Sequence, residues 1–284
     1  MSQPEQIQAL KALRDWWAEM GVDADEAEIR ALTKAARTSV GPAAPPQTAR
    51  RPRAIPKEKR HEDWVEEARN LARAAATMAD LKAAIEGFDG CLLKEAARNA
   101  ACYDGVEGAP VMVIGEGPGA EEDKQGKPFV GRAGQLLDRM LAAIGLSRAT
   151  NVFITNVNYW RPPGNRNPSE DELAICRPFV DKHIALVKPK LIIAAGTVTA
   201  KSLLGVEEGI TRLRGRQFDL TVPGLSSPVP VFPVFHPAYL LRRPAEKAKA
   251  WSDLLNILNT LETLGIAPDN HGNHNNGRGY KTEV

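Results

Sequence analysis

Three polar residues stand where apolar runs of the sequence end. Glu116 comes just after the run at residues 110–114, Asn156 closes the run FITN, and His236 follows VFPVF and precedes Pro237. A carboxylate can hold a water molecule, a planar amide offers one acceptor and two donors, and an imidazole held stiff by the next proline can donate to a developing anion. Taken singly, a capping or solvated carboxylate, a loop-capping asparagine and a core histidine are the commoner interpretations. Together the three residues favour a site with hydrogen-bonding and acid–base chemistry.

A glycine-rich segment surrounds the first of these residues. Gly115, Gly117 and Gly119 do not have the G-x-G-x-x-G spacing of a dinucleotide-binding turn, and the acids at residues 121–123 follow directly. Negative charge at that turn would repel a pyrophosphate. We therefore expect no nucleotide cofactor, and we expect the glycines to let a backbone or a base approach closely.

A second candidate surface follows His236. Leu240 and Leu241 are followed by Arg242 and Arg243. This order places an apolar wedge beside charge that can bind phosphate, which is the combination needed to push a base out of a DNA stack. The alternative is that both leucines belong to the core at the start of a helix.

The elements that must position these residues alternate along the chain. Short apolar runs at residues 110–114, 152–155, 191–195 and 229–235 are separated by helical patterns. One helix is expected from Gly131 to about Gly145, one begins with the capping box of Ser169 and Glu172, a short one is capped by Thr197, and the last ends near Leu264. The pattern predicts an α/β fold with a four-stranded parallel sheet covered on both faces. Ligands of such sheets bind at the carboxyl ends of the strands, where the polar residues converge.

Composition limits the remaining possibilities. The net charge is +2 and three cysteines are scattered along 284 residues, which excludes a strongly basic protein and a disulfide framework. We expect no membrane span and no secretory signal, and hence a cytoplasmic protein. We divide the chain into an N-terminal helical segment (1–38), a Pro- and Arg-rich linker (39–60), one catalytic domain (61–265) and a disordered tail (266–284).

Several segments occur in a fixed order and spacing. They are GEGPGAEEDKQGKPFVGRAGQLLDRML, ITNVNYWRPPGNRNPSEDEL, PKLIIAAGTVTAKSLLG, RLRGR and VFPVFHPAYLLRRP. Together they closely resemble the family 4 uracil-DNA glycosylases, over about residues 88–255. The resemblance implies a three-layer α/β/α fold that binds a flipped-out uracil at the strand ends, here with an N-terminal helical extension.

The resemblance also implies roles for matching residues. Uracil donates from N3–H and accepts at O4, whereas cytosine reverses both, so one rigid amide can distinguish them. An acidic position of the family is matched by Glu122, to which we give a secondary role. The implied roles are Glu116 near the catalytic water, His236 as stabiliser of the leaving base, Asn156 as base reader, Phe129 as the ring stacked on uracil, Gly115 and Gly117 as backbone lining, and Leu240, Leu241 and Arg242 as DNA contacts.

The chain departs from the family at an iron-sulfur site. Members usually hold a cluster on four cysteines, and Cys91 and Cys176 match two of these positions, while Phe88 and Trp160 stand at the other two. Aromatic rings cannot ligate iron, and Cys102 does not fall at a ligand position. We therefore predict no metal and no cluster, and we expect the two aromatic residues to fill the vacated volume.

The sequence thus predicts a monofunctional hydrolase that removes uracil from DNA and leaves an abasic site. Its expected partners are uracil-containing DNA and the abasic product. A lyase would need an activated lysine, and nothing marks Lys124 or Lys127 as one. The main alternative is a protein that binds uracil-containing or abasic DNA without turnover.

Overall fold

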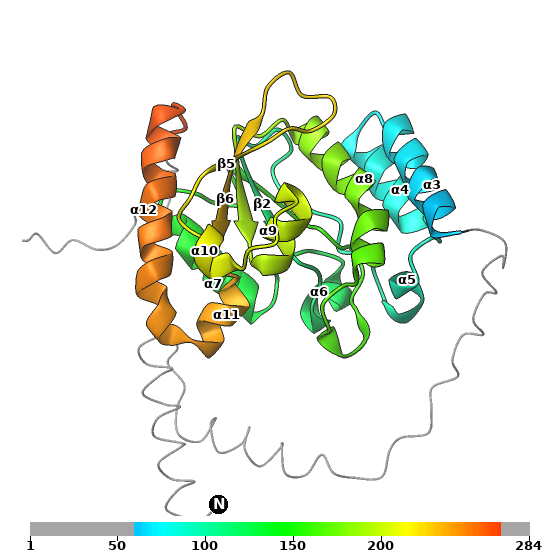
Figure 1. Ribbon diagram of the computed structural model, residues 1–284, viewed down its shortest axis with the longest axis horizontal. Coiled ribbons are helices and arrows are strands. Elements are labelled where there is room, and N and C mark those ends of the chain that lie inside the picture. Colours follow the sequence, from blue (N-terminus) through cyan, green and yellow to red (C-terminus); the bar gives the residue numbers. More distant parts are fainter. Residues whose placement is uncertain (1–59, 268–284) are drawn as a thin grey trace, which may run out of the picture. The chain divides into compact units, whose positions relative to one another are not determined.

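The structure is a computed structural model that describes residues 60–267 (Figure 1). The predicted N-terminal helical segment, nearly all of the linker and the tail beyond residue 267 lie outside the described residues. Within residues 60–267, no helix is long and apolar enough to cross a membrane.

A single mixed sheet lies at the centre of the described residues. Its strand order is β1-β3-β2-β4-β6-β5. The four inner strands are parallel, as predicted, and their bounds match the four apolar runs to within one residue. Two short antiparallel edge strands, β1 and β5, correct the prediction of a four-stranded sheet to six strands. The strands are β1 (Asp104–Gly105), β2 (Val111–Gly115), β3 (Val152–Asn156), β4 (Leu191–Ala195), β5 (Phe218–Leu220) and β6 (Val229–Val234).

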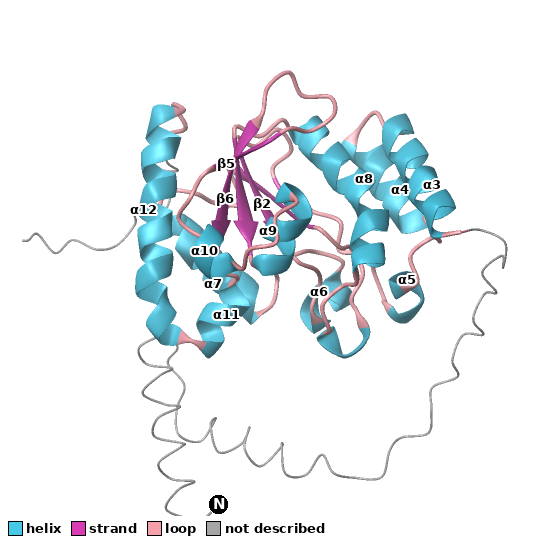
Figure 2. Cartoon of the chain, in the orientation of Figure 1, coloured by secondary structure: helices cyan, strands magenta, loops and turns pink. Residues whose placement is uncertain are grey.

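Helices cover both faces of this sheet (Figure 2). Short 3-10 turns at Pro163–Asn165 and Pro244–Glu246 complete the regular structure. The helices are α3 (His61–Ala74), α4 (Met78–Gly87), α5 (Leu93–Ala96), α6 (Ala120–Gln125), α7 (Arg132–Ala142), α8 (Glu170–Val187), α9 (Thr197–Leu204), α10 (Ile210–Leu213), α11 (Pro237–Arg242) and α12 (Lys247–Thr263).

The three layers arise because the apolar side chains of each inner strand point alternately to the two faces of the sheet. Successive side chains of a strand point to opposite faces, so Met112 and Ile114 pack in one core with α3, α4 and α8, while Val111 and Val113 pack in a second core with α7 and α12. Figure 1 shows the sheet between these two groups of helices. The three-layer arrangement expected from the sequence is therefore present.

Local signals explain where two of the helices begin. Ser169 and Glu172 form the predicted capping box, in which Glu172 Oε2 accepts from the Ser169 N–H at 2.7 Å and Ser169 Oγ accepts from the Glu172 N–H at 3.2 Å. The cap predicted at Thr197 is displaced by one residue. Gly196 precedes the helix with φ of +98°, and a Cβ there would lie 3.2 Å from His236 Cβ, so this position favours glycine.

The strand order places a switch point at the middle of the sheet. From β2 the chain crosses to β3 on one side and then returns to β4 on the other side. The connections from neighbouring strands diverge at such a point, and this leaves space outside their carboxyl ends. The segments after β2, β3, β4 and β6 meet at this edge.

Candidate active site

Four of the predicted residues lie together at the carboxyl edge of the sheet. A Cβ on Gly115 would lie 2.5 Å from both Asn156 Oδ1 and the ring of Phe129, so the missing side chain leaves room between them. The rings of Phe129 and His236 are stacked, with centroids 5.5 Å apart and planes inclined by 26°. We call Gly115, Phe129, Asn156 and His236 the candidate site.

Asn156 is the unusual member of this set. Its side chain is 1% exposed, yet neither Oδ1 nor Nδ2 has a hydrogen-bond partner. Burying one unpaired polar atom costs about 1–3 kcal/mol. Because native cores rarely leave such groups unpaired, this amide stands out as a candidate ligand-binding group.

The tautomer of His236 follows from its contacts. Its Nδ1 accepts from the backbone N–H of Ala238 at 3.1 Å, as the cap of α11, which leaves the proton on Nε2. Burial and the charge of Arg242 together lower the pKa of His236 to about 4, against an opposing effect of Glu122. The ring is therefore a neutral donor at neutral pH.

Phe129 has a backbone conformation that is uncommon for its residue type. Its φ is 53°, in the left-handed region. After it, the backbone N–H groups of Val130 and Gly131 both donate to Glu122 Oε1, at 3.0 and 2.8 Å. Glu122 Oε2 also accepts from the Gly119 N–H at 3.1 Å, so Glu122 ties the start of α6 to the segment that carries Phe129.

Glu116 comes directly after β2 and is partly buried. Burial raises the pKa of its carboxyl above the ordinary value. Within residues 60–267 its carboxylate makes no hydrogen bond or ion pair, which leaves it available to a water molecule. Gly117 lies against Asn158 and not against the candidate site. A Cβ on Gly117 would be 3.1 Å from Asn158 Nδ2.

The predicted DNA-contacting residues separate in the structure. Leu240 is 1% exposed and packs with Leu136 and Phe235 in a small core cluster. This burial fits the alternative that Leu240 belongs to the core. Leu241 is partly exposed and Arg242 is exposed, so we narrow the predicted wedge to Leu241 with Arg242 beside it.

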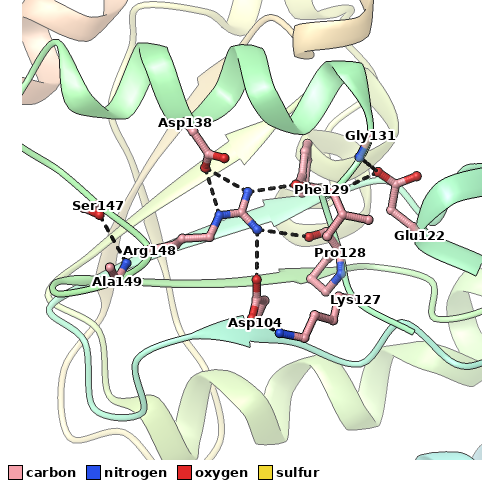
Figure 3. Close-up of polar contacts among 11 residues, drawn as sticks. Asp104, Glu122, Lys127, Pro128, Phe129, Gly131, Asp138, Ser147, Arg148 and Ala149 are labelled. Carbon is pink, nitrogen blue, oxygen red and sulfur yellow. Dashed lines mark hydrogen bonds and ion pairs between the residues drawn. The ribbon is translucent and has the colours of Figure 1, made fainter. Parts of the chain in front are cut away.

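Arg148 was not singled out from the sequence. It lies just before β3 and donates to the backbone carbonyl of Phe129 and to two carboxylates (Figure 3). Its partners are 10, 19 and 44 residues away along the chain. No local spacing brings them together, and the sequence therefore held no signal for this contact.

Comparison with known proteins decides the family. The family model for the uracil DNA glycosylase superfamily matches residues 103–255, more than half of the chain. A type-4 uracil-DNA glycosylase of Pyrobaculum aerophilum is 38% identical over 174 residues, which cover 60% of this chain and 87% of the relative. The chain belongs to the family 4 uracil-DNA glycosylases. Type-4 relatives from Saccharolobus solfataricus (36% over 203 residues, 66% and 93% covered) and Sulfurisphaera tokodaii (42% over 159 residues, 54% and 71% covered) agree.

Two of the four positions that hold iron-sulfur cysteines in the family are aromatic in this glycosylase. The residues at these four positions are all at most 2% exposed and lie in the same core cluster. We call these four residues, Phe88, Cys91, Trp160 and Cys176, the aromatic plug. The ring of Phe88 meets that of Phe179 edge-on at 5.4 Å. Two thiols and two aromatic rings do not provide the four thiolates that a cluster requires.

The two thiols of the plug contact each other. Their hydrogen bond and burial raise the pKa of Cys176 well above its ordinary value, so this thiol stays protonated. Among residues 60–267, no three His, Cys, Asp or Glu side chains are grouped so as to hold a metal ion. The residues present therefore do not fit an iron-sulfur cluster.

Proposed function

We propose that this glycosylase cleaves the bond between uracil and deoxyribose in DNA by hydrolysis, and that it releases uracil and leaves an abasic site. The buried and unpartnered amide of Asn156 carries the proposal. A base that is swung out of the duplex would supply the two hydrogen bonds that this amide lacks.

Three of the four residues of the candidate site have a part in the proposed reaction, and Gly115 leaves room for the base between Asn156 and Phe129. Asn156 Oδ1 accepts from uracil N3–H and Nδ2 donates to O4, a pattern that cytosine reverses. The ring of Phe129 stacks on the base. His236 Nε2–H donates to O2, where negative charge develops as the bond to the sugar breaks.

The water that replaces the base needs a separate group. Glu116 is partly buried and has no ionic partner in the described part of the chain. We assign its carboxylate to hold the water that attacks the sugar carbon and to stabilise the positive charge that develops there. The oxygen of this water and one of its protons become the hydroxyl of the abasic sugar. The other proton passes to Glu116, and the base departs as an anion that takes up a proton to become uracil.

On the DNA side, we assign Leu241 to the gap that the base leaves and Arg242 to a neighbouring phosphate. The partners are thus uracil-containing DNA and the abasic product, with no nucleotide cofactor. The three cysteines are free thiols, which is consistent with action in the reducing cytoplasm.

We also propose that the protein works without an iron-sulfur cluster, because the aromatic plug replaces two of the four ligands. Iron and acid-labile sulfide should each fall far below four atoms per chain in protein purified without oxygen. Stoichiometric iron and sulfide, with the absorbance of a cluster, would contradict the proposal.

The test of function uses a labelled oligonucleotide with a single uracil, treated with alkali after incubation. Strand scission should require uracil in the DNA and should be lost with Asn156→Asp and reduced with His236→Ala. A matched oligonucleotide with thymine in place of uracil is the control. Scission that does not depend on these residues would remove the site assignment.

The variant Glu116→Gln distinguishes the enzyme from a protein that only binds uracil-containing DNA. The enzyme should lose rate with this variant while it keeps its affinity for uracil-containing DNA, since the substitution removes charge and little volume. A wild-type protein that binds such DNA firmly but never releases uracil would establish the alternative.

A further inference from the structure

We propose that Arg148 is a positioning residue that sets the place of the Phe129 ring. The inference rests on the proposed role of Phe129 as the ring stacked on uracil. No contact between Arg148 and the base is needed, because the guanidinium acts on the backbone of residues 128–129.

Arg148 contacts two backbone carbonyls, those of Pro128 and Phe129, and two carboxylates (Figure 3). Nη2 donates to the carbonyl oxygen of Phe129 at 2.8 Å, and Nη1 donates to that of Pro128 at 3.3 Å. Nε donates to Asp138 Oδ1 at 2.8 Å, and Nη1 donates to Asp104 Oδ2 at 3.0 Å. All three nitrogens of the planar fork are thus engaged, which fixes its orientation.

The two carboxylates anchor the fork to different layers of the fold. Asp104 belongs to the edge strand β1 and Asp138 to helix α7. Burial would raise the pKa of Asp104, but hydrogen bonds from Arg148 and Lys127 outweigh it and hold that pKa below the ordinary value. Asp104 therefore stays charged at neutral pH, and together Asp104 and Asp138 hold the guanidinium in place.

Phe129 needs such support because its φ of 53° is unfavourable for an aromatic residue. Its carbonyl also faces α7 closely, since a Cβ on Gly134 would lie 1.9 Å from that oxygen. Arg148 holds the carbonyl side of this segment, and Glu122 holds the N–H groups on the far side. Arg148 and Glu122 thus hold the backbone that carries the ring from both sides.

A purely structural ion pair would predict something different. If Arg148 only stabilised the fold, its loss would lower stability and would change the rate independently of Phe129. If it acts through Phe129, its loss should have no further effect once the ring is gone. A double-mutant cycle distinguishes the two cases.

We would measure single-turnover uracil release for Arg148→Ala, Phe129→Ala and the double variant, together with affinity for uracil-free DNA. The expected result is a rate about 10- to 100-fold lower for Arg148→Ala, since a ring displaced by about 1 Å can cost that much. Affinity for uracil-free DNA should be unchanged, and the double variant should be no slower than Phe129→Ala. Arg148→Lys, which keeps the charge but not the fork, should recover only part of the rate, and it serves if Arg148→Ala does not fold.

The matched control is Arg177→Ala. Arg177 likewise binds a carboxylate, Asp181 at 2.7 Å, and a main-chain carbonyl, that of Ser202, but in α8 on the opposite face of the sheet. Its loss should leave the single-turnover rate unchanged at temperatures where the variant is folded. Effects of Arg148→Ala and Phe129→Ala that multiply, or a normal rate for Arg148→Ala, would overturn the inference alone. A normal rate for Phe129→Ala would overturn it together with the assigned role of Phe129.

Discussion

Two asparagines that leave the same strand have opposite surroundings. Asn156 and Asn158 are both buried, at 1% and 0% exposure. Asn158 Nδ2 donates to the Trp160 carbonyl at 2.6 Å and its Oδ1 accepts from the Trp160 N–H at 3.3 Å, whereas the Asn156 amide has no partner. The Asn158 amide is paired with the backbone of the aromatic plug, and the Asn156 amide is unpaired.

The difference shows how this fold separates stability from recognition. In the plug, polar atoms are paired and large rings are buried, which is the arrangement that stabilises a core. In the candidate site, the amide of Asn156 is buried and left unpaired, which lowers stability and is typical of a binding site. Substitutions in the aromatic plug and in the candidate site should therefore differ in their effects on stability and on rate.

The largest effect is expected for Asn156→Leu. Loss of two hydrogen bonds to the base should lower the rate of uracil release about 10²- to 10⁴-fold, at about 1–3 kcal/mol for each bond. The free energy of unfolding should stay the same or rise, because two unpaired polar atoms leave the core. Asn158→Leu is the control and should instead lose about 1–3 kcal/mol of stability. Equal destabilisation by both variants in chemical denaturation would break the comparison.

The plug should respond mainly in stability. Trp160→Ala removes a fully buried indole, and such truncations lower the free energy of unfolding by about 3–5 kcal/mol. The rate of uracil release by the remaining folded protein should change little. Urea denaturation and single-turnover kinetics, each done well below the melting temperature, test the two parts. A large loss of rate without a loss of stability would place Trp160 in the site instead.

His236→Ala should lower the rate about 10²- to 10³-fold, the usual effect of removing one donor to a developing anion. Since the pKa of His236 is about 4, the wild-type rate should show no step near pH 6.5. The decline on the acid side should follow protonation of Glu116, whose pKa is raised by burial. Single-turnover rates between pH 4 and 8 check this, and a step near pH 6.5 that vanishes in the variant would contradict it.

The smallest effect concerns His183, which lies on the plug side of the sheet. Burial lowers its pKa to about 4, whereas in the unfolded chain it binds a proton near pH 6.5. The unfolded state binds more protons between these values, so the free energy of unfolding should fall as the pH is lowered from about 6.5 to 4. The full effect is at most about 3 kcal/mol. His183→Phe should flatten this dependence in denaturation curves; an unchanged slope would show that other groups carry it.

The inner sheet was predictable because its signals are local. Each parallel strand is buried on both faces, so it appears in the sequence as a continuous apolar run with sharp ends. The edge strands were missed because two or three residues hold no period. The helix His61–Ala74 was also missed, since the residues that it buries fully are only Ala68 and Ala72, and alanine gives little contrast.

The candidate site was predictable only in part. Glu116, Asn156 and His236 follow strands, and their common edge follows from a parallel sheet. Leu240 and Leu241 are equally apolar, and only the packing of α11 separates a core residue from an exposed one. The contacts of Arg148 depend on chain segments that meet only after folding.

The shortest strand of the sheet has a consequence for how rigid the enzyme can be. Strand β1 consists of Asp104 and Gly105 at an edge, where few ladder bonds resist local opening. Such an opening detaches Asp104 from Arg148 and leaves Asp138 as the remaining carboxylate. Amide exchange at Val106, whose N–H donates to the Val152 carbonyl at 3.0 Å, reports this event. We therefore expect opening of this edge to shorten the time for which the segment that carries Phe129 is held in place.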